Sequence, residues 1–368
     1  MTKVKHLLSI VLLLHFFACA QDKNTNVANY EYETVVNDLE IPWGFVFLPD
    51  NSMLITEKAG TLIHFKNGKK TEITGLPAIK RHGQGGLMDI ALHPDYKNNG
   101  WIYFTYASAE GEGSGANTAL MRAKISNNTL TNKELLYKAT PNFSGPDHFG
   151  SRIIFDKNNY LFFSIGERGE RDLNPQDLTR DGGKIYRLKD DGSIPADNPF
   201  VNTPNAKKAI YTYGHRNPQG LIYIEETNSI WSHEHGPKGG DEINIIEAGK
   251  NYGWPVITYG INYWGTKITD ITEKEGMEQP IHYWTPSIAP SGMCYVTSDK
   301  YKGWKGNILV GSLRFQYLDR CVIKNNKVVY EEKLLDNLGR VRSVVQGPDG
   351  YIYAGVENVG IVKIIPKN

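Results

Sequence analysis

The hydrophobic positions along the chain follow a short strand–turn–strand pattern. An apolar segment leads into a turn built on Pro-Asp, Asn-Asn or Asn-Ser, and a second segment rich in aromatic and β-branched residues follows. Two copies of this unit lie at residues 44–56 and 89–106. No long stretch has the 3.6-residue periodicity of an amphipathic helix. The pattern therefore predicts β-hairpins rather than helices.

The hairpin unit occurs six times, with turns near residues 50, 95, 158, 228, 306 and 349. A repeat of at least ~40 residues with one hairpin per unit is typical of four-stranded propeller blades. The longer intervals in the middle of the chain leave room for inserted loops, which in propellers lie on one face. We therefore predict an all-β fold, a single six-bladed β-propeller over residues 35–368 with loop insertions on the active-site face. A β-sandwich or a pair of barrels is the alternative.

The N-terminal residues resemble an export signal. Lys3 and Lys5 precede an apolar run at 7–17 that is too short to span a bilayer comfortably, and the small residues Ala18-Cys19-Ala20 follow it. We expect residues 1–20 to be a signal peptide or lipoprotein signal and residues 21–34 to be a polar linker. Either ordinary cleavage releases a chain that begins at Gln21, or Cys19 is the acylated first residue of a lipoprotein. The protein is then exported, and is periplasmic or lipid-anchored to a bacterial membrane.

Composition narrows the class of protein without naming a function. The 41 Lys+Arg residues nearly balance the 40 Asp+Glu residues, and no basic block is present, which argues against a nucleic-acid partner. A hydrophobic content of 40% is too high for a disordered chain. Export makes Cys294 and Cys321 candidates for a disulfide, and two buried thiols are the alternative.

Two short segments offer residues suited to proton transfer and anion binding. His148 follows Asp147 immediately before a predicted strand, and a histidine beside a carboxylate is a candidate general base. Arg216 and Asn217 follow His215 at a turn, where a cation and an amide suit a carboxylate or carbonyl oxygen. The non-functional alternatives are a surface turn for the segment with His148 and a structural arginine for the segment with Arg216.

Residues 233–242 offer candidate metal ligands. The His-x-His spacing suggests zinc, but no third histidine is suitably placed. Gly236 and Pro237 instead expose backbone carbonyls in a turn. Together with Asp241, Glu242 and Tyr252, these oxygen donors favour Ca²⁺ over Zn²⁺. A solvated turn is the alternative for the two acidic residues.

Three late arginines suggest an anionic ligand. Arg340 and Arg342 are spaced so that a strand would point both to the same side, and Arg314 precedes them. Adjacent guanidinium groups repel each other unless an anion lies between them, so the pair indicates a polyacidic ligand. Surface carboxylates are the alternative partners. Gln84 adds an amide in a glycine-rich turn.

Six motifs in order resemble the glucose/sorbosone dehydrogenase family, and within it the soluble aldose sugar dehydrogenases of bacterial periplasms that depend on pyrroloquinoline quinone (PQQ). The resemblance spans roughly residues 35–365, and the family fold is a six-bladed β-propeller, in agreement with the repeat count. The motifs are Gly85–Asp95, Asp147–Arg152, Gly214–Gly220, Glu234–Pro237, Asp241–Asn244 and Asn251–Pro255.

The resemblance implies oxidation of aldose sugars at C1 to the lactone, with hydride transfer to the quinone. His148 would be the general base, with Glu167 beside it, where some members have Asp. Arg216 would lie beside the reacting quinone oxygens. The further cofactor contacts would be Gln84, Asn217, His235, Tyr263, Arg314, Arg340 and Arg342. His235 replaces a glutamine of the glucose-specific members, and Arg314 replaces a family lysine.

The resemblance also implies two Ca²⁺ ions. Carbonyls of Gly236 and Pro237 would bind the ion at PQQ, and Glu242 and Tyr252, with Asp241, would hold a structural ion. The implied partners are an aldose substrate and an unidentified electron acceptor, with no nucleic acid and no membrane contact beyond a lipid at Cys19. The alternatives are a non-catalytic ligand- or protein-binding propeller and a Ca²⁺-dependent lactonase-type hydrolase.

Overall fold

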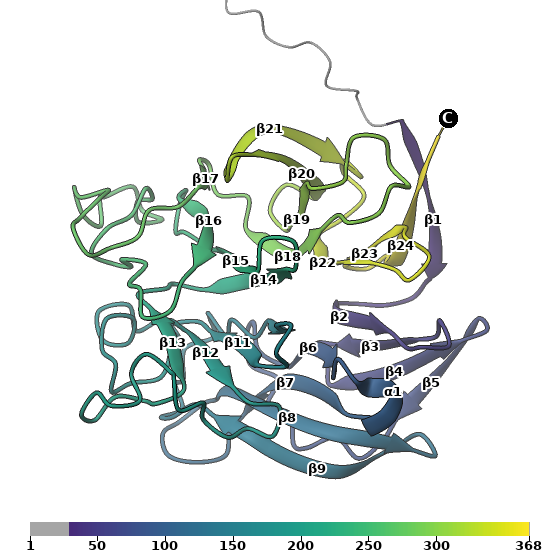
Figure 1. The fold of residues 1–368 in the computed structure, drawn as a ribbon, viewed down its shortest axis with the longest axis horizontal. Helices are drawn as coiled ribbons and strands as arrows, with labels where there is room; N and C mark the ends of the chain where they lie inside the picture. The colour runs from purple at the N-terminus through teal and green to yellow at the C-terminus, as the bar shows by residue number, and fades with distance from the viewer. Residues whose placement is uncertain (1–28, 368) are drawn as a thin grey trace, which may run out of the picture.

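Six four-stranded antiparallel sheets make up nearly all the regular structure of residues 29–367, the part of the chain that the computed structural model describes. The sheets are arranged around a common centre (Figure 1), which confirms the six-bladed propeller. The expected signal at 1–20 and the first part of the expected linker lie outside the described residues. The linker prediction is wrong for residues 30–34, because they form the start of a blade strand.

The first three blades follow chain order. Blade 1 comprises β2 (Pro42–Phe47), β3 (Met53–Glu57), β4 (Thr61–Lys66) and β5 (Lys69–Ile73). Blade 2 comprises β6 (Leu87–Leu92), β7 (Ile102–Ser108), β8 (Asn117–Ser126) and β9 (Thr129–Lys138), with the short helix α1 (Tyr96–Asn99) between its first two strands. Blade 3 comprises β10 (Ile153–Phe155), β11 (Leu161–Ile165), β12 (Lys184–Leu188) and β13 (Ile210–Tyr213).

The other three blades complete the ring. Blade 4 comprises β14 (Pro218–Ile224), β15 (Ser229–Glu234), β16 (Asp241–Ile246) and β17 (His282–Trp284). Blade 5 comprises β18 (Pro290–Tyr295), β19 (Ile308–Ser312), β20 (Tyr317–Lys324) and β21 (Lys327–Leu334). Blade 6 comprises β22 (Val341–Gln346), β23 (Ile352–Val356), β24 (Gly360–Pro366) and the N-terminal strand β1 (Tyr30–Val36).

Both ends of the propeller domain therefore share one blade. β1 pairs with β24 in antiparallel register from Tyr30↔Pro366 to Val36↔Ile361. Figure 1 shows the purple β1 beside the yellow β24. The pairing closes the ring between the first and last strands of the described chain.

The innermost strands define the two faces of the propeller. β2, β6, β10, β14, β18 and β22 each contact the next in order, and β22 contacts β2. All six predicted turns lie between the first and second strands of a blade, at the ends of these inner strands. The inner strands all begin at the opposite end, where the turns between second and third strands also lie. We call this end the site face.

Apolar residues fill the space between neighbouring blades. Leu87, Phe104 and Tyr106 of blade 2 pack with Leu54 and Leu62 of blade 1, for example, and all five are buried. Hydrophobic alternation along the strands thus produces contacts between sheets, as a propeller requires. Within residues 29–367 no helix is long and apolar enough to cross a membrane.

The two cysteines of the propeller are free thiols. Cys294 and Cys321 are both buried, and they lie in separate hydrophobic clusters. The structure therefore has two buried thiols rather than the disulfide that export made possible.

Candidate active site

A cavity of about 790 Å³ opens on the site face. The loop between β11 and β12 and the long connection between β16 and β17 form much of its wall. That connection runs beside β13, through the bridge Tyr213↔Asn251, and pairs with the β15–β16 turn through Lys238↔Ile261. The sequence-predicted residues that line the cavity are Gln84, His148, Glu167, Arg216, Pro237 and Tyr263.

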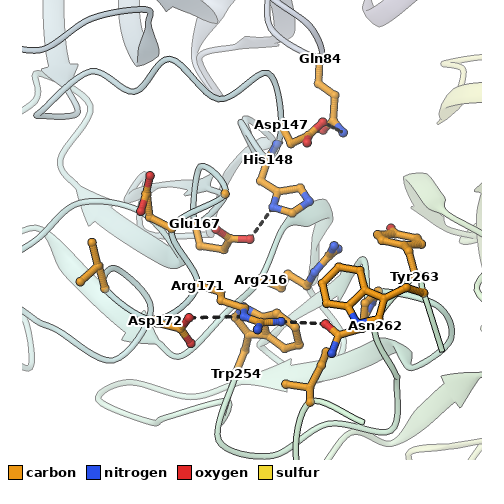
Figure 2. Close-up of a pocket in the computed structure, with 16 residues that line it drawn as sticks. Gln84, Asp147, His148, Glu167, Arg171, Asp172, Arg216, Trp254, Asn262 and Tyr263 are labelled. Atoms are coloured by element: carbon orange, nitrogen blue, oxygen red, sulfur yellow. Dashed lines mark hydrogen bonds and ion pairs between the residues drawn. The ribbon is translucent and has the colours of Figure 1, made fainter. Parts of the chain in front are cut away.

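His148 and Glu167 form a hydrogen bond at the cavity wall. His148 Nδ1 lies 2.5 Å from Glu167 Oε1, and the two side chains are 12% and 2% exposed (Figure 2). Since a carboxylate only accepts, Nδ1 carries a hydrogen and Nε2 keeps the free lone pair. Gly166 allows this approach, because a Cβ there would lie 2.3 Å from the His148 carbonyl oxygen.

Gln84 fixes the loop that carries the histidine. Its Oε1 accepts from the His148 backbone N–H at 3.1 Å, and its Nε2 donates to Asp147 at 3.0 Å. His148 has a φ of 58°, a left-handed conformation that few residues other than glycine adopt. Held backbone strain of this kind is common at functional sites.

Burial lowers the basicity of His148 below that of an ordinary histidine. Loss of solvent lowers the pKa of His148, the Arg216 guanidinium lowers it further, and Glu167 opposes both. The imidazole is therefore neutral at neutral pH, as a proton acceptor must be.

Arg216 lies beside the histidine on a rigid support. Its guanidinium donates to the backbone carbonyls of His235 at 3.1 Å and Gly236 at 2.8 Å. Its backbone N–H donates to Glu234 Oε2, whose other oxygen contacts His215 Nδ1 at 2.8 Å. Its backbone carbonyl accepts from the Glu167 N–H at 2.8 Å. Glu234, which the sequence analysis did not assign a role, thus orients the loop that carries Arg216.

Arg340 and Arg342 point to the same side, as predicted. Arg340 Nε lies 2.7 Å from Glu357 Oε2, and Arg342 Nη2 lies 2.6 Å from Glu357 Oε1. Arg340 also donates to the Leu313 carbonyl, next to Arg314. Two guanidinium groups share one carboxylate, so a net positive charge remains. Glu357 was missed because it follows β23, far from any motif.

Asn217 and His235 are held close to the starts of inner strands. Asn217 Oδ1 accepts from the Gly150 N–H at 3.0 Å, while its Nδ2 is buried without a hydrogen-bond partner in the described chain. His235 Nε2 contacts the Pro290 carbonyl at 2.7 Å, and burial lowers its pKa well below the usual value. Tyr263 is 66% exposed at the cavity rim.

The oxygens of Asp241, another candidate metal ligand, are occupied by protein donors. Its oxygens accept from the Gly236 N–H at 2.8 Å, from Ser287 Oγ at 2.7 Å and from the Ala289 N–H at 2.9 Å. The carboxylate therefore anchors the turn that presents Gly236 and Pro237.

Glu242 lies in a second, very small cavity of about 10 Å³, enough for one water-sized occupant. Glu234, its partner across the strands, lines the same cavity, as does Tyr252. Burial, and then the Glu234 charge, raise the pKa of Glu242 to about 8. The Tyr252 hydroxyl is occupied by the Ile245 carbonyl and the Glu247 N–H. The hydroxyl is therefore not free to bind a cation, and the backbone carbonyl is the other oxygen of this residue.

Comparison with known proteins assigns this chain to a family. The glucose/sorbosone dehydrogenase family description matches residues 39–363. The aldose sugar dehydrogenase of Escherichia coli is 39% identical over 351 residues, covering 93% of this chain and 94% of that protein. The chain belongs to the glucose/sorbosone dehydrogenase family and is an oxidoreductase.

Solved structures agree. The apo form of the soluble E. coli aldose sugar dehydrogenase superposes with a TM-score of 0.87 at 38% identity, covering 92% of this chain and all of that chain. A PQQ-bound aldose sugar dehydrogenase from Streptomyces coelicolor gives 0.75 at 28% identity, covering 92% of this chain and 99% of that chain. The fold that the repeats predicted is thus the fold of solved relatives.

Proposed function

We propose that this protein oxidises aldose sugars at C1 to the lactone with PQQ as cofactor, and that His148 is the general base. The observation that carries the proposal is the His148–Glu167 pair beside the Arg216 guanidinium in one open cavity. A proton acceptor and a fixed cation on the same wall suit removal of a hydroxyl proton with hydride loss from the same carbon.

The residues present fit a tricarboxylate cofactor. Arg340 and Arg342 retain net positive charge after pairing with Glu357, and Lys58 lies close enough for Arg342 to lower its pKa, after burial itself. The buried Asn217 Nδ2 lacks a partner within residues 29–367. A planar polyanion with carbonyl groups would be bound by cations in excess of carboxylates and by an amide N–H that has no other acceptor, and both are present.

The chain's own groups divide the chemistry. His148 Nε2 accepts the proton of the sugar C1 hydroxyl, and Glu167 stabilises the imidazolium that results. Arg216 donates toward oxygens on which negative charge develops. PQQ, when bound, would supply the hydride acceptor, and an external electron acceptor would be required for the next turnover.

Calcium has two candidate positions. Pro237 lines the large cavity and the preceding Gly236 lines the small one, so the carbonyls of this turn are suited to an ion bound with the cofactor. The Gly236 carbonyl already accepts from Arg216, but a carbonyl oxygen has a second lone pair. Glu242 and the Tyr252 carbonyl suit a separate structural ion.

Reconstitution tests the proposal. Purified protein mixed with PQQ and Ca²⁺ should change the quinone absorption spectrum and oxidise aldoses with an artificial electron acceptor. Protein with Ca²⁺ alone is the matched blank. No spectral change and no turnover on a panel of aldoses would overturn the proposal, and hydrolysis of lactones without PQQ would favour the hydrolase alternative.

A further inference from the structure

A second group of metal-ligating side chains lies in the outer half of blade 5, away from the cavity. Asp319 and Cys321 are two residues apart on β20, so they share one face of the strand. Glu331 on β21 is the direct cross-strand partner of Cys321. One ligand atom from each of the three lies within 4.8 Å of the others.

Blade 4 orients these groups. Trp284 on β17 donates from Nε1 to Asp319 Oδ2 at 3.2 Å and also to Glu331 Oε1. His282 Nε2 lies 3.2 Å from the same Glu331 oxygen. Asp319 is 2% exposed, and its Oδ1 is buried without a hydrogen-bond partner in the described chain. A carboxylate oxygen is thus left over within a group that a neighbouring blade holds in position.

The charge of the group is not balanced by a nearby arginine. Arg320 lies between Asp319 and Cys321 in sequence, but it points to the other face and pairs with Glu332 at 2.6 Å. The two carboxylates and the thiol on the first face are therefore not paired with this arginine.

Access and donor chemistry favour a cation. A surface cavity of about 410 Å³ reaches Asp319 and Glu331, with Trp284 on its wall. One thiolate and two carboxylates form a mixed sulfur–oxygen set, which suits Zn²⁺ and disfavours Ca²⁺. Tetrahedral bonds of about 2.0–2.3 Å place ligand atoms about 3.3–3.8 Å apart, so separations that now reach up to 4.8 Å would have to shorten on binding.

We propose that Asp319, Cys321 and Glu331 bind a thiophilic divalent cation of the Zn²⁺ class, with His282 or water in the fourth position. The ion joins blade 5 to β17 of blade 4 through the Trp284 and His282 contacts. The site is independent of the proposed sugar oxidation, since none of its residues lines the active-site cavity.

Cobalt provides a direct readout of the thiolate. Co²⁺ added to the reduced, metal-stripped full chain in excess Ca²⁺ should bind at about one equivalent and produce a sulfur-to-cobalt charge-transfer band. Zn²⁺ should remove the band and raise the melting temperature, because it binds the folded state. Cys321→Ser should abolish the band, and Asp319→Asn should weaken Co²⁺ binding by at least about tenfold.

Cys294→Ser is the matched control, because Cys294 is the other buried free thiol. It should leave the band unchanged. Circular dichroism confirms that each variant is folded. Absence of the band in the unmodified chain, or an equal band in folded Cys321→Ser, would overturn the proposal. Asp319, Cys321 and Glu331 would then be a group that shares protons rather than a metal site.

Discussion

The two sides of the proposed active site, of which only the His148 side lines the cavity, handle charge in opposite ways. Around His148, one carboxylate meets one imidazole, and burial keeps that imidazole neutral. Around Arg340 and Arg342, two permanent cations share the single carboxylate of Glu357. The first arrangement is suited to moving a proton, and the second to holding an anion. The difference predicts that substitutions on the two sides will affect different measured quantities.

The largest expected effect is on turnover. His148→Ala should lower kcat by about 10²–10⁴-fold, since a positioned general base contributes that much. PQQ affinity, measured by titration of the quinone spectrum, should change little. His64→Ala is the control, because His64 lies in blade 1 and contacts Ser52. Full turnover in His148→Ala would show that another group takes the proton.

The next effect is on cofactor binding. Arg340→Ala should weaken PQQ binding by about 10- to 100-fold, the size of a lost charge-assisted hydrogen bond. At saturating PQQ most of the turnover should return. Lys66→Ala, which removes an exposed cation paired with Asp50, should have no effect on either quantity. If Arg340→Ala instead lowered kcat at saturating PQQ as much as His148→Ala does, the division between the two sides would be wrong.

A third test concerns the candidate structural calcium site at Glu242. Glu242→Gln should remove the rise in melting temperature that Ca²⁺ gives the unmodified protein, because it deletes a charged ligand. Glu225→Gln, an acidic residue on the opposite face, should keep the rise. An unchanged response in Glu242→Gln would place the structural ion elsewhere.

The smallest expected effect is a shift of the pH profile. kcat/KM should fall as the pH drops through the His148 pKa, which burial and Arg216 place below the usual value of 6.5. Glu167→Gln removes an interaction that raises this pKa, so the acid limb should move to lower pH. Asp147→Asn removes the weakest such interaction and should move it less. A shift to higher pH in Glu167→Gln would contradict the assigned pair.

The strand turns were readable from the sequence, whereas many site contacts were not. Every predicted turn lies in the link between the first and second strands of a blade, and in four of the six a Pro-Asp or Asn-Asn pair favours a turn locally. The contact between Arg342 and Glu357 joins the start of β22 to the turn that follows β23. No local sequence pattern encodes a contact between these two positions. The resemblance supplied His148, Glu167 and Arg216, but neither the support that Glu234 gives to Arg216 nor the bond from the His148 backbone to Gln84.

One signal for the missing carboxylates does exist. Glu57 and Glu234 each end the second strand of a blade, and each accepts the backbone N–H of a residue just before the first strand: Glu40 in blade 1 and Arg216 in blade 4. Glu357 follows the second strand of blade 6. Aligning the six repeats on their turns would have brought these acidic positions together, because blades share geometry as well as pattern.

The pairing of β1 with β24 has a consequence for how the molecule is made. The first strand of the described chain finds its partner only when nearly the last residues have been synthesised, since Tyr30 meets Pro366. Loop closure over almost the whole chain makes this seam the contact of highest sequence separation. A chain shortened at either end would retain five complete sheets, but the edge of the sixth would stay open to self-association.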